Sequence, residues 1–170
     1  IDNSFDAGAT DISLTLHNDL IQIEDNGIGI TKDRELSIVV FGEHGSMPTT
    51  QLGRFGIGLK YHAVSAGNIL DVDSVSTDGR MSLDVDWLHI LKSGKWAIQN
   101  PVWTQTLKTV SRGTNISIRK LRWRSASEKD IEKMRSKLSE IFYPALHVGS
   151  TITLNGEALL VLQEPEMNNM

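Results

Sequence analysis

The chain has 170 residues, of which 39% are hydrophobic and 22% are charged, and this balance suits one compact globular domain with its own core. The absence of cysteine excludes disulfides and cysteine zinc sites, and a formal net charge of −4 gives no overall field that would attract nucleic acid. No apolar run approaches the roughly 20 residues of a membrane helix, and no signal-peptide pattern follows Ile1, so we expect a cytoplasmic domain without membrane contact whose sequence begins inside a longer polypeptide.

The first segment predicts the end of a helix followed by a hairpin. Residues Ile1 to Ala9 contain no helix breaker before Gly8. Two runs of alternating apolar and polar residues then flank the turn residues His17-Asn18-Asp19, which is typical of two half-buried antiparallel strands. The alternating apolar residues are Ile12, Leu14 and Leu16 in the first run and Ile21 and Ile23 in the second. We expect this hairpin to end at Asp25-Asn26-Gly27.

The middle of the chain predicts two helices separated by a loop, and then three strands. The helices are expected over Lys32–Val40 and Gly56–Ala66, and the segment from Phe41 to Phe55 is rich in glycine, serine and threonine, which is typical of a mobile loop. Further alternation predicts strands around Leu70 and Val72, around Leu83 and Val85, and around Ile116 and Ile118.

The clearest helix prediction covers Ser127–Phe142. Ser127 is a candidate N-cap with Asp130 three residues later, as in a capping box. One apolar stripe, which we expect to face the core, consists of Ile131, Met134, Leu138 and Ile141. A last hairpin is expected from strands near Thr151–Leu154 and Ala158–Val161 around the turn Asn155-Gly156.

The order of these elements predicts an α+β fold. Helices and strands do not alternate regularly, so a doubly wound parallel sheet is disfavoured relative to a two-layer sandwich with helices on one face of a mostly antiparallel sheet. We expect a single domain over residues 1–170, with the chemically informative motifs in 1–120 and a C-terminal helix and hairpin in 121–170.

The first informative cluster is Asn3 with Asp6. Three positions apart on a helix, the two side chains share a face, and an amide oxygen beside a carboxylate suits a hard cation such as Mg²⁺. A lone pair of this kind is more often an N-cap or a solvated face.

The second cluster is Asp25-Asn26-Gly27-Ile28-Gly29-Ile30. A carboxylate at a strand end beside glycines allows a flat ring to approach the backbone, and it would accept a hydrogen bond from an exocyclic amine such as that of adenine. An ordinary Asp-Asn-Gly turn is the alternative.

The third cluster is Gly53-Arg54-Phe55-Gly56-Ile57-Gly58-Leu59-Lys60. A glycine-rich loop that leads into a helix presents backbone N–H groups and a helix N-terminus to an anion. The spacing is that of neither a P-loop nor a dinucleotide fingerprint.

In this order and spacing, the clusters together resemble the motifs of the GHKL ATPases, in the branch of MutL, the MORC proteins and the ninety-kilodalton heat-shock chaperone. The stretch from Asp2 to Thr10 resembles the N-box, Ile23 to Ile30 resembles the first glycine box, and Gly53 to Lys60 resembles the second. A fourth element, Gly113-Thr114-Asn115-Ile116, fits the later Gly-Thr-x-Ile motif. The resemblance implies a Bergerat fold that binds ATP or ADP with Mg²⁺.

The resemblance also implies roles for individual residues at the base and the metal. Asn3 would ligate Mg²⁺, while Asp6 and Ala7 would line the adenine side of the pocket. Asp25 would accept the adenine amino group, with Thr114 helping through an ordered water. The residues expected to let the base lie close and pack on it are Gly27, Gly29 and Ile30.

The phosphates are expected to rest on the second glycine box. The backbone N–H groups that would hold them belong to Gly53, Phe55, Gly56, Ile57 and Gly58. Lys60 would reach a phosphate or only solvent, and Phe41 to Leu52 would form a lid that closes over ATP. Closure would gate contact with a second subunit, giving a homodimer, or with further domains of the same polypeptide.

The general base is the main departure from the family pattern. The resemblance implies a glutamate four residues before Asn3, which falls two residues before Ile1, and Asp2 lies on the wrong helical face to replace it. ATP binding is therefore expected of this chain, while hydrolysis depends on a residue outside it. The alternatives are a nucleotide-sensing module that never hydrolyses ATP and a histidine-kinase catalytic domain.

Other conspicuous residues are assigned to structure. The basic run Arg119, Lys120, Arg122 and Arg124 beside Trp123 could contact DNA phosphates, but a solvated strand edge is favoured. The five histidines have no zinc-binding spacing; His44 is expected in the loop and His62 is expected to pack on its helix. The tryptophans, expected in the core or at subunit contacts, are Trp87, Trp96, Trp103 and Trp123.

Overall fold

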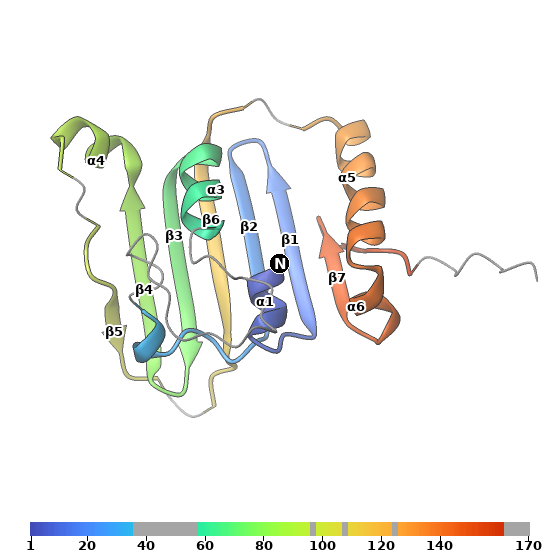
Figure 1. The fold of residues 1–170 in the computed structure, drawn as a ribbon, viewed down its shortest axis with the longest axis horizontal. Helices are drawn as coiled ribbons and strands as arrows, with labels where there is room; N and C mark the ends of the chain where they lie inside the picture. The colour runs from blue at the N-terminus through green and yellow to red at the C-terminus, as the bar shows by residue number, and fades with distance from the viewer. Residues whose placement is uncertain (36–57, 96–97, 107–108, 124–125, 162–170) are drawn as a thin grey trace, which may run out of the picture.

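One sheet organises the residues that the computed structural model describes, which are 1–35, 58–95, 98–106, 109–123 and 126–161. Its eight strands within these ranges are β1 (Asp11–His17), β2 (Leu20–Asp25), β3 (Gly67–Ser76), β4 (Gly79–Asp86), β5 (Val102–Thr104), β6 (Gly113–Leu121), β7 (Thr151–Leu154) and β8 (Glu157–Ala158). Across the sheet they follow the order β5-β4-β3-β6-β2-β1-β7-β8 (Figure 1). The strands β1 and β7 are parallel, and every other neighbouring pair is antiparallel.

The α-helices of the described residues pack on one face of this sheet. They are α1 (Asp2–Asp6), α3 (Gly58–Ala66), α4 (Trp87–Ser93), α5 (Glu128–Ile141) and α6 (Tyr143–His147), and a 3₁₀ turn, η1, covers Lys32–Arg34. In Figure 1, α3 lies over β3 and β6, and α1 lies over β1 and β2. The expected two-layer α+β sandwich with a mostly antiparallel sheet is therefore confirmed. No helix in the described ranges is long and apolar enough to span a membrane.

Apolar and polar residues alternate along the strands, so one face of the sheet is buried and apolar. In β4 every second residue is buried, and Leu83 and Val85 pack with Leu70 and Val72 of β3 against α3 and α4. A second cluster joins β1 and β7 to the helices at the other end of the sheet. Its buried members are Ala9, Ile12, Leu14, Leu146, Ile152, Leu154 and Leu159. The two clusters share Ile21 of β2, which packs against both, so the core is continuous across the sheet.

The opposite face of the sheet is polar and carries ion pairs between strands. Arg119 of β6 donates to Asp71 of β3 over 2.6 and 2.8 Å, and Arg80 of β4 donates to Asp73 over distances down to 2.7 Å. Burial works to raise the pKa of Asp71, but the hydrogen bonds from Arg119 and Asp84 outweigh it and lower that pKa. The hydrogen bond with Asp71 in turn raises the pKa of Asp84.

Helix α5 begins with the predicted capping box but does not bury the predicted stripe. The Ser127 hydroxyl accepts from the Asp130 N–H, and the Asp130 carboxylate accepts from the Ser127 N–H. Ile131 and Leu138 pack against the core, whereas Met134 and Ile141 are 37% and 56% exposed. The stripe prediction was therefore wrong for half its members, because the face of α5 that packs against the core is narrower than the predicted stripe.

Several other predictions need correction. Within the described part of the predicted helix Lys32–Val40, only Lys32–Arg34 is helical, and positions 36–40 lie outside the described residues. The last strand is Glu157–Ala158 rather than Ala158–Val161. Trp87 is buried as expected, while Trp123 is 46% exposed, and Trp96 lies outside the described residues.

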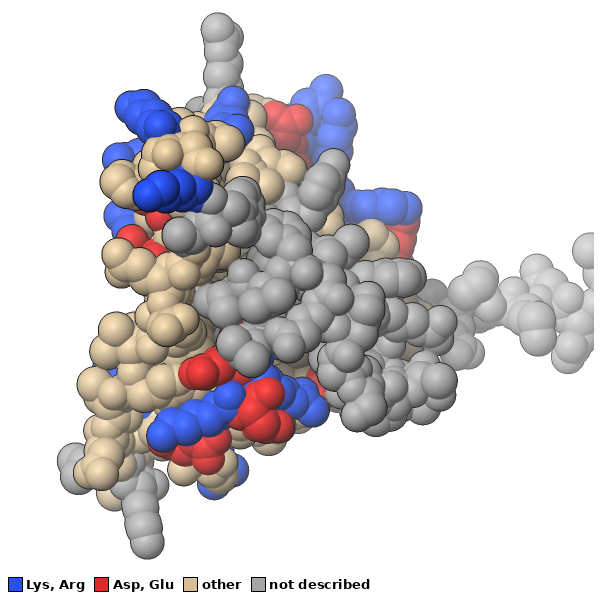
Figure 2. Space-filling view, turned by 60° about the vertical axis from the view of Figure 1, so that its left-hand side comes forward, with Lys and Arg blue, Asp and Glu red and all other residues tan. Residues whose placement is uncertain are grey.

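The basic run does not lie on a sheet edge, because β6 sits between β3 and β2. Its first member, Arg119, is engaged by Asp71, while Lys120 and Arg122 are exposed and Arg124 lies outside the described residues. On the side that carries β4 and β5, lysines and arginines gather at the end where α4 lies, and a mixed group of both signs lies at the other end (Figure 2). Contact with nucleic acid stays the less favoured alternative.

Candidate functional site

Three polar side chains lie side by side on the buried face of the sheet. Asp25 of β2 is the register partner of Thr114 on β6, and Thr114 is the register partner of Ser74 on β3. Register partners on neighbouring strands point to the same face, so Asp25, Thr114 and Ser74 form one row across three strands. The row continues on both sides through apolar residues, Ile12 on one side and Met81 on the other, and we call its centre the polar row.

Asp25 is held by one of its two oxygens. Its Oδ1 accepts from the backbone N–H of Gly27 over 3.0 Å and from the backbone N–H of Thr114 over 3.2 Å. The half-buried carboxylate is thereby fixed in orientation, and within the described residues its Oδ2 has no hydrogen bond. An ionised carboxylate is an acceptor only, so the second oxygen is suited to a donor group of a ligand.

Asn26 fastens the loop after Asp25 to the start of β1. Its Oδ1 accepts from the backbone N–H groups of Thr10 and Asp11 over 2.9 and 3.0 Å. Its Nδ2 donates to Thr10 Oγ1 over 3.0 Å and to Asp11 Oδ2 over 2.7 Å. One side chain therefore joins the end of the N-box-like stretch to the first glycine box, and its amide oxygen and amide nitrogen make two bonds each.

Two glycines let residues Gly27–Ile30, which we call the glycine loop, lie close to Ala7 and to β3. A Cβ on Gly27 would lie 2.9 Å from both the Cβ and the carbonyl oxygen of Ala7, closer than real Cβ atoms come. Gly29 has a φ of +74°, and a Cβ there would run into the carbonyl of Val75 on β3. The backbone N–H of Ile28 also donates to the carbonyl of Ala7 over 3.0 Å, so the end of α1 and the glycine loop are in direct contact.

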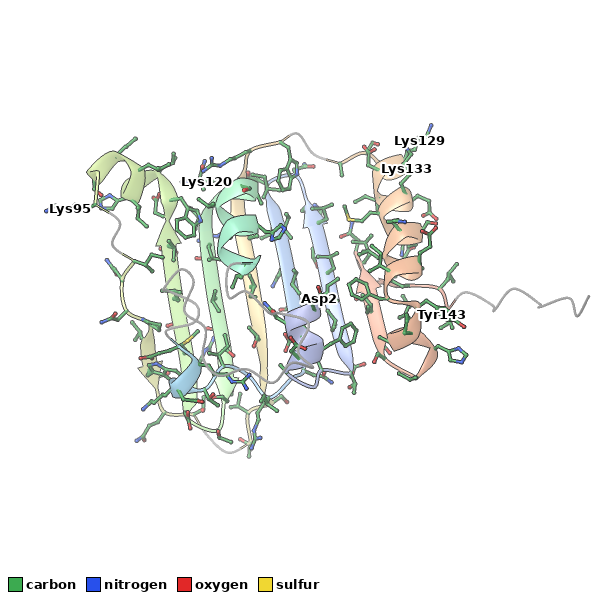
Figure 3. The ribbon with its side chains drawn as sticks, viewed as in Figure 1. Asp2, Lys95, Lys120, Lys129, Lys133 and Tyr143 are labelled. Atoms are coloured by element: carbon green, nitrogen blue, oxygen red, sulfur yellow. The ribbon has the colours of Figure 1, made fainter. Side chains whose placement is uncertain are left out.

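The residues predicted at the metal lie on α1, which crosses over β1 and β2 and also carries the labelled Asp2 (Figure 3). Asn3 is exposed and Asp6 is half-buried, and Ala7 directly follows this short helix. Within the described residues no group of three or more histidine, cysteine or acidic side chains could hold a metal ion. An oxygen of Asn3 fits Mg²⁺ as a single protein ligand, which is the sparse coordination Mg²⁺ adopts when phosphates supply the remainder.

Ser74 is a member of the polar row that was not predicted from the sequence. Its side chain is 1% exposed, and its Oγ accepts from the backbone N–H of Ile30 over 2.9 Å and donates to the carbonyl of Gly113 over 3.1 Å. Thr114 Oγ1 lies 3.0 Å from the same oxygen. The signal was present in the alternation of β3, where the inward positions 70 and 72 are apolar and positions 74 and 76 are serine.

The expected phosphate site falls largely outside the described residues. Gly53, Phe55, Gly56 and Ile57 lie in the range 36–57, as do the predicted lid Phe41–Leu52 and His44. Helix α3 covers Gly58–Ala66 of the predicted helix Gly56–Ala66, and positions 56 and 57 lie outside the described residues. The backbone of Lys60 belongs to α3, while its side chain lies outside what the structure describes.

A tryptophan anchors the segment that leads into the predicted lid. The indole N–H of Trp103 on β5 donates to Glu35 Oε2 over 2.6 Å, and Lys32 Nζ lies 5.5 Å from the centre of the same ring. The backbone N–H of Lys32 also donates to Asp78 Oδ2 over 2.8 Å. Residues 32 and 35 are thus fastened to the edge of the sheet immediately before residue 36, which gives Trp103 a structural role.

Comparisons with known proteins agree with this architecture. Residues 1–114 match the family model described as histidine kinase-, DNA gyrase B- and HSP90-like ATPase. No curated protein matches the sequence of the chain.

Solved structures are similar in fold. The ATPase region of Saccharomyces cerevisiae topoisomerase II has a TM-score of 0.68 at 14% identity, and the match covers 93% of this chain and 47% of that one. The ATPase and transducer domains of topoisomerase II from Balamuthia mandrillaris give a TM-score of 0.64 at 14% identity, covering 94% and 47%. The Aquifex aeolicus MutL ATPase domain complexed with ADP gives 0.58 at 17% identity, covering 98% and 61%. The chain thus spans about half the length of the topoisomerase structures.

Proposed function

The chain belongs to the histidine kinase-, DNA gyrase B- and HSP90-like ATPase family, and on that basis we propose that it binds ATP with the adenine against the polar row. The base would lie over the end of β2, where the glycine loop Gly27–Ile30 allows a flat ring to approach the backbone. Its amino group would donate to Asp25, and Thr114 would contribute a second hydrogen bond through an ordered water.

The proposal rests on the difference between the two carboxylate oxygens of Asp25. One carboxylate oxygen accepts two backbone N–H groups, and the other has no hydrogen bond within the described residues. A carboxylate used only to stabilise a turn would need the first oxygen alone. A charge-assisted bond from the second oxygen to a ligand amine is worth about 1.5–3 kcal/mol, which is enough to select the ligand.

The metal and the phosphates would be held by residues from both ends of the motif set. Asn3 would offer its side-chain oxygen to Mg²⁺, and Asp6 and Ala7 would line the adenine side of the pocket. Bound Mg²⁺ would neutralise charge on the triphosphate. Backbone N–H groups of Gly53, Phe55, Gly56, Ile57 and Gly58 would hold the phosphates at the start of α3, with Lys60 close by.

We further propose that ATP serves this domain as a conformational switch. Closure of Phe41–Leu52 over the nucleotide would gate contact with a second copy or with another part of a longer polypeptide, and hydrolysis would reverse it. Trp103, Lys32 and Glu35 support this, because they attach residues 32 and 35 to the sheet ahead of that segment. Release of phosphate from ATP distinguishes an ATPase from a module that only senses nucleotide.

Calorimetry tests the proposal on the 170-residue chain. Titration of a folded sample with Mg²⁺ and ATP should give saturable heat with one site per chain, and ADP should compete for that site. A sample that retains its circular dichroism and cooperative melting but shows no heat with millimolar ATP or ADP would contradict the proposal.

A further inference from the structure

Ser74 is in contact with its neighbour in the polar row, Thr114. It lies on β3 in register with Thr114, and its side chain is 1% exposed. Three groups surround its oxygen: the N–H of Ile30 at 2.9 Å, the carbonyl of Gly113 at 3.1 Å and the hydroxyl of Thr114 at 3.0 Å. These partners come from the glycine loop and from the start of β6, so Ser74 connects the two segments that flank Asp25.

Counting protons fixes the direction of each bond. A serine hydroxyl has one proton to donate and two lone pairs that accept. The Ile30 N–H takes one lone pair of Ser74, and the carbonyl of Gly113, which only accepts, takes the proton. The remaining lone pair of Ser74 then faces Thr114, so all three contacts are hydrogen bonds only when Thr114 donates its own proton to Ser74.

The direction of this bond decides what Thr114 can offer to a ligand. With its proton donated to Ser74, the Thr114 oxygen offers only lone pairs, and Oδ2 of Asp25, which has no hydrogen bond within the described residues, is also an acceptor. Asp25 therefore requires a donor from the ligand, and the ordered water on Thr114 must donate to Thr114 and can offer the ligand a lone pair. A purine with an amino group at its six-membered ring meets this requirement, while a purine with an oxo group at the same position presents an acceptor to an acceptor.

We propose that Ser74 is a positioning residue that sets the choice of base by orienting the Thr114 hydroxyl, an inference that rests on the proposed ATP site. Without the Ser74 hydroxyl, Thr114 is free to turn its proton toward the ordered water, and the water can then donate to an oxo group of the ligand. The preference for ATP over inosine triphosphate, which has an oxo group in place of the amino group and a proton on the neighbouring ring nitrogen, should then fall by roughly threefold to tenfold, the range of one neutral hydrogen bond.

The test compares Ser74→Ala with a matched control, Ser76→Ala. Ser76 is on the same strand and the same face, is 6% exposed and accepts from the backbone N–H of Asp78 over 3.2 Å. Calorimetric affinities for ATP and inosine triphosphate with Mg²⁺ give the preference of each protein. We expect the preference to fall in Ser74→Ala and to stay at the parent value in Ser76→Ala, because a merely structural loss weakens both nucleotides equally.

A second variant separates action through Thr114 from direct action. Thr114→Val keeps the shape of the side chain and removes its hydroxyl, so adding Ser74→Ala to it should change the preference no further. If Ser74→Ala does not fold, Ser74→Cys replaces it, since sulfur preserves most of the volume and is a weak acceptor.

An unchanged preference in the Ser74 variant, an equal change in Ser76→Ala, or a parent that binds the two nucleotides equally overturns the role of Ser74 while leaving the ATP site in place. A folded parent that binds neither nucleotide overturns the proposed function and with it this inference.

Discussion

The carboxylate of Asp25 and the backbone N–H of Thr114 are 3.2 Å apart although 89 positions separate the two residues in the sequence. The contact joins the end of β2 to the start of β6 on the buried face of the sheet. It fixes Asp25 while sparing one of its oxygens, so the polar row is both a structural joint and the place where we expect the base to bind.

Replacing Asp25 with asparagine should remove nucleotide binding and leave the fold. The amide oxygen of asparagine still accepts from Gly27 and Thr114, whereas the amide nitrogen presents a donor where the ligand amine needs an acceptor. We expect ATP affinity to fall at least roughly tenfold in calorimetry, with a melting temperature close to that of the parent. Binding as tight as that of the parent would refute the assignment of the adenine to Asp25.

Replacing Gly29 with alanine should displace the glycine loop. The new Cβ would collide with the carbonyl of Val75, and the φ of +74° adds backbone strain. Gly94→Ala is the matched control, because Gly94 has a φ of +64° and a Cβ added there would meet open space. Both variants should lose about 1 kcal/mol to the backbone strain, and Gly29→Ala should lose more in thermal melts and should also lose ATP affinity.

Replacing Asn26 with alanine should loosen the joint between the glycine loop and β1. The side chain makes four hydrogen bonds to Thr10 and Asp11, and their loss should reduce the free energy of unfolding by about 1–3 kcal/mol. Asn155→Ala, which removes two bonds to Leu16 at the far hairpin, should also destabilise the fold but should leave ATP affinity unchanged. Equal ATP affinity in both variants would argue against a role for Asn26 in holding the site.

The capping box of α5 should make stability depend on pH. Hydrogen bonds from the side chain and the backbone of Ser127 lower the pKa of Asp130. A carboxyl group whose pKa is lower in the folded state adds stability above the ordinary aspartate value of about 3.9, and this contribution is lost as the pH falls through the lowered value. Asp130→Asn should therefore melt below the parent at neutral pH, and the gap in melting temperature should close in acid. A gap that is constant with pH would show that the charge of Asp130 is not involved.

The sequence predicted the half-buried strands well because their alternation has a physical cause. In β1, β3, β4 and β6 one face packs on the helices and the other meets water, so period-two patterns are required. The prediction failed where that cause is absent. Helix α4 starts at the buried Trp87 directly after β4, β5 has three residues, and α6 has five with Pro144 in its first turn, so none is long enough to show a period.

The candidate site was predictable to the extent that local motifs define it. The strand end at Asp25 and the close approach at Gly27 and Gly29 lie within one short stretch, and Thr114 of β6 is the register partner of Asp25. Ser74 required knowledge of which strands are neighbours, since β3 meets β6 only in the folded sheet. From the sequence alone, a serine at an inward strand position indicates only a residue with low strand propensity, because its hydrogen-bond partners are not known.

The polar row contains one residue from each of three strands. It therefore forms only when those strands pair in the native register. A shift of β6 by a single residue would turn Thr114 to the solvent-exposed face of the sheet and bring Asn115 or Gly113 beside Asp25. A misaligned chain would thus lose the ligand along with the alignment, and nucleotide present during folding would favour the native pairing by mass action.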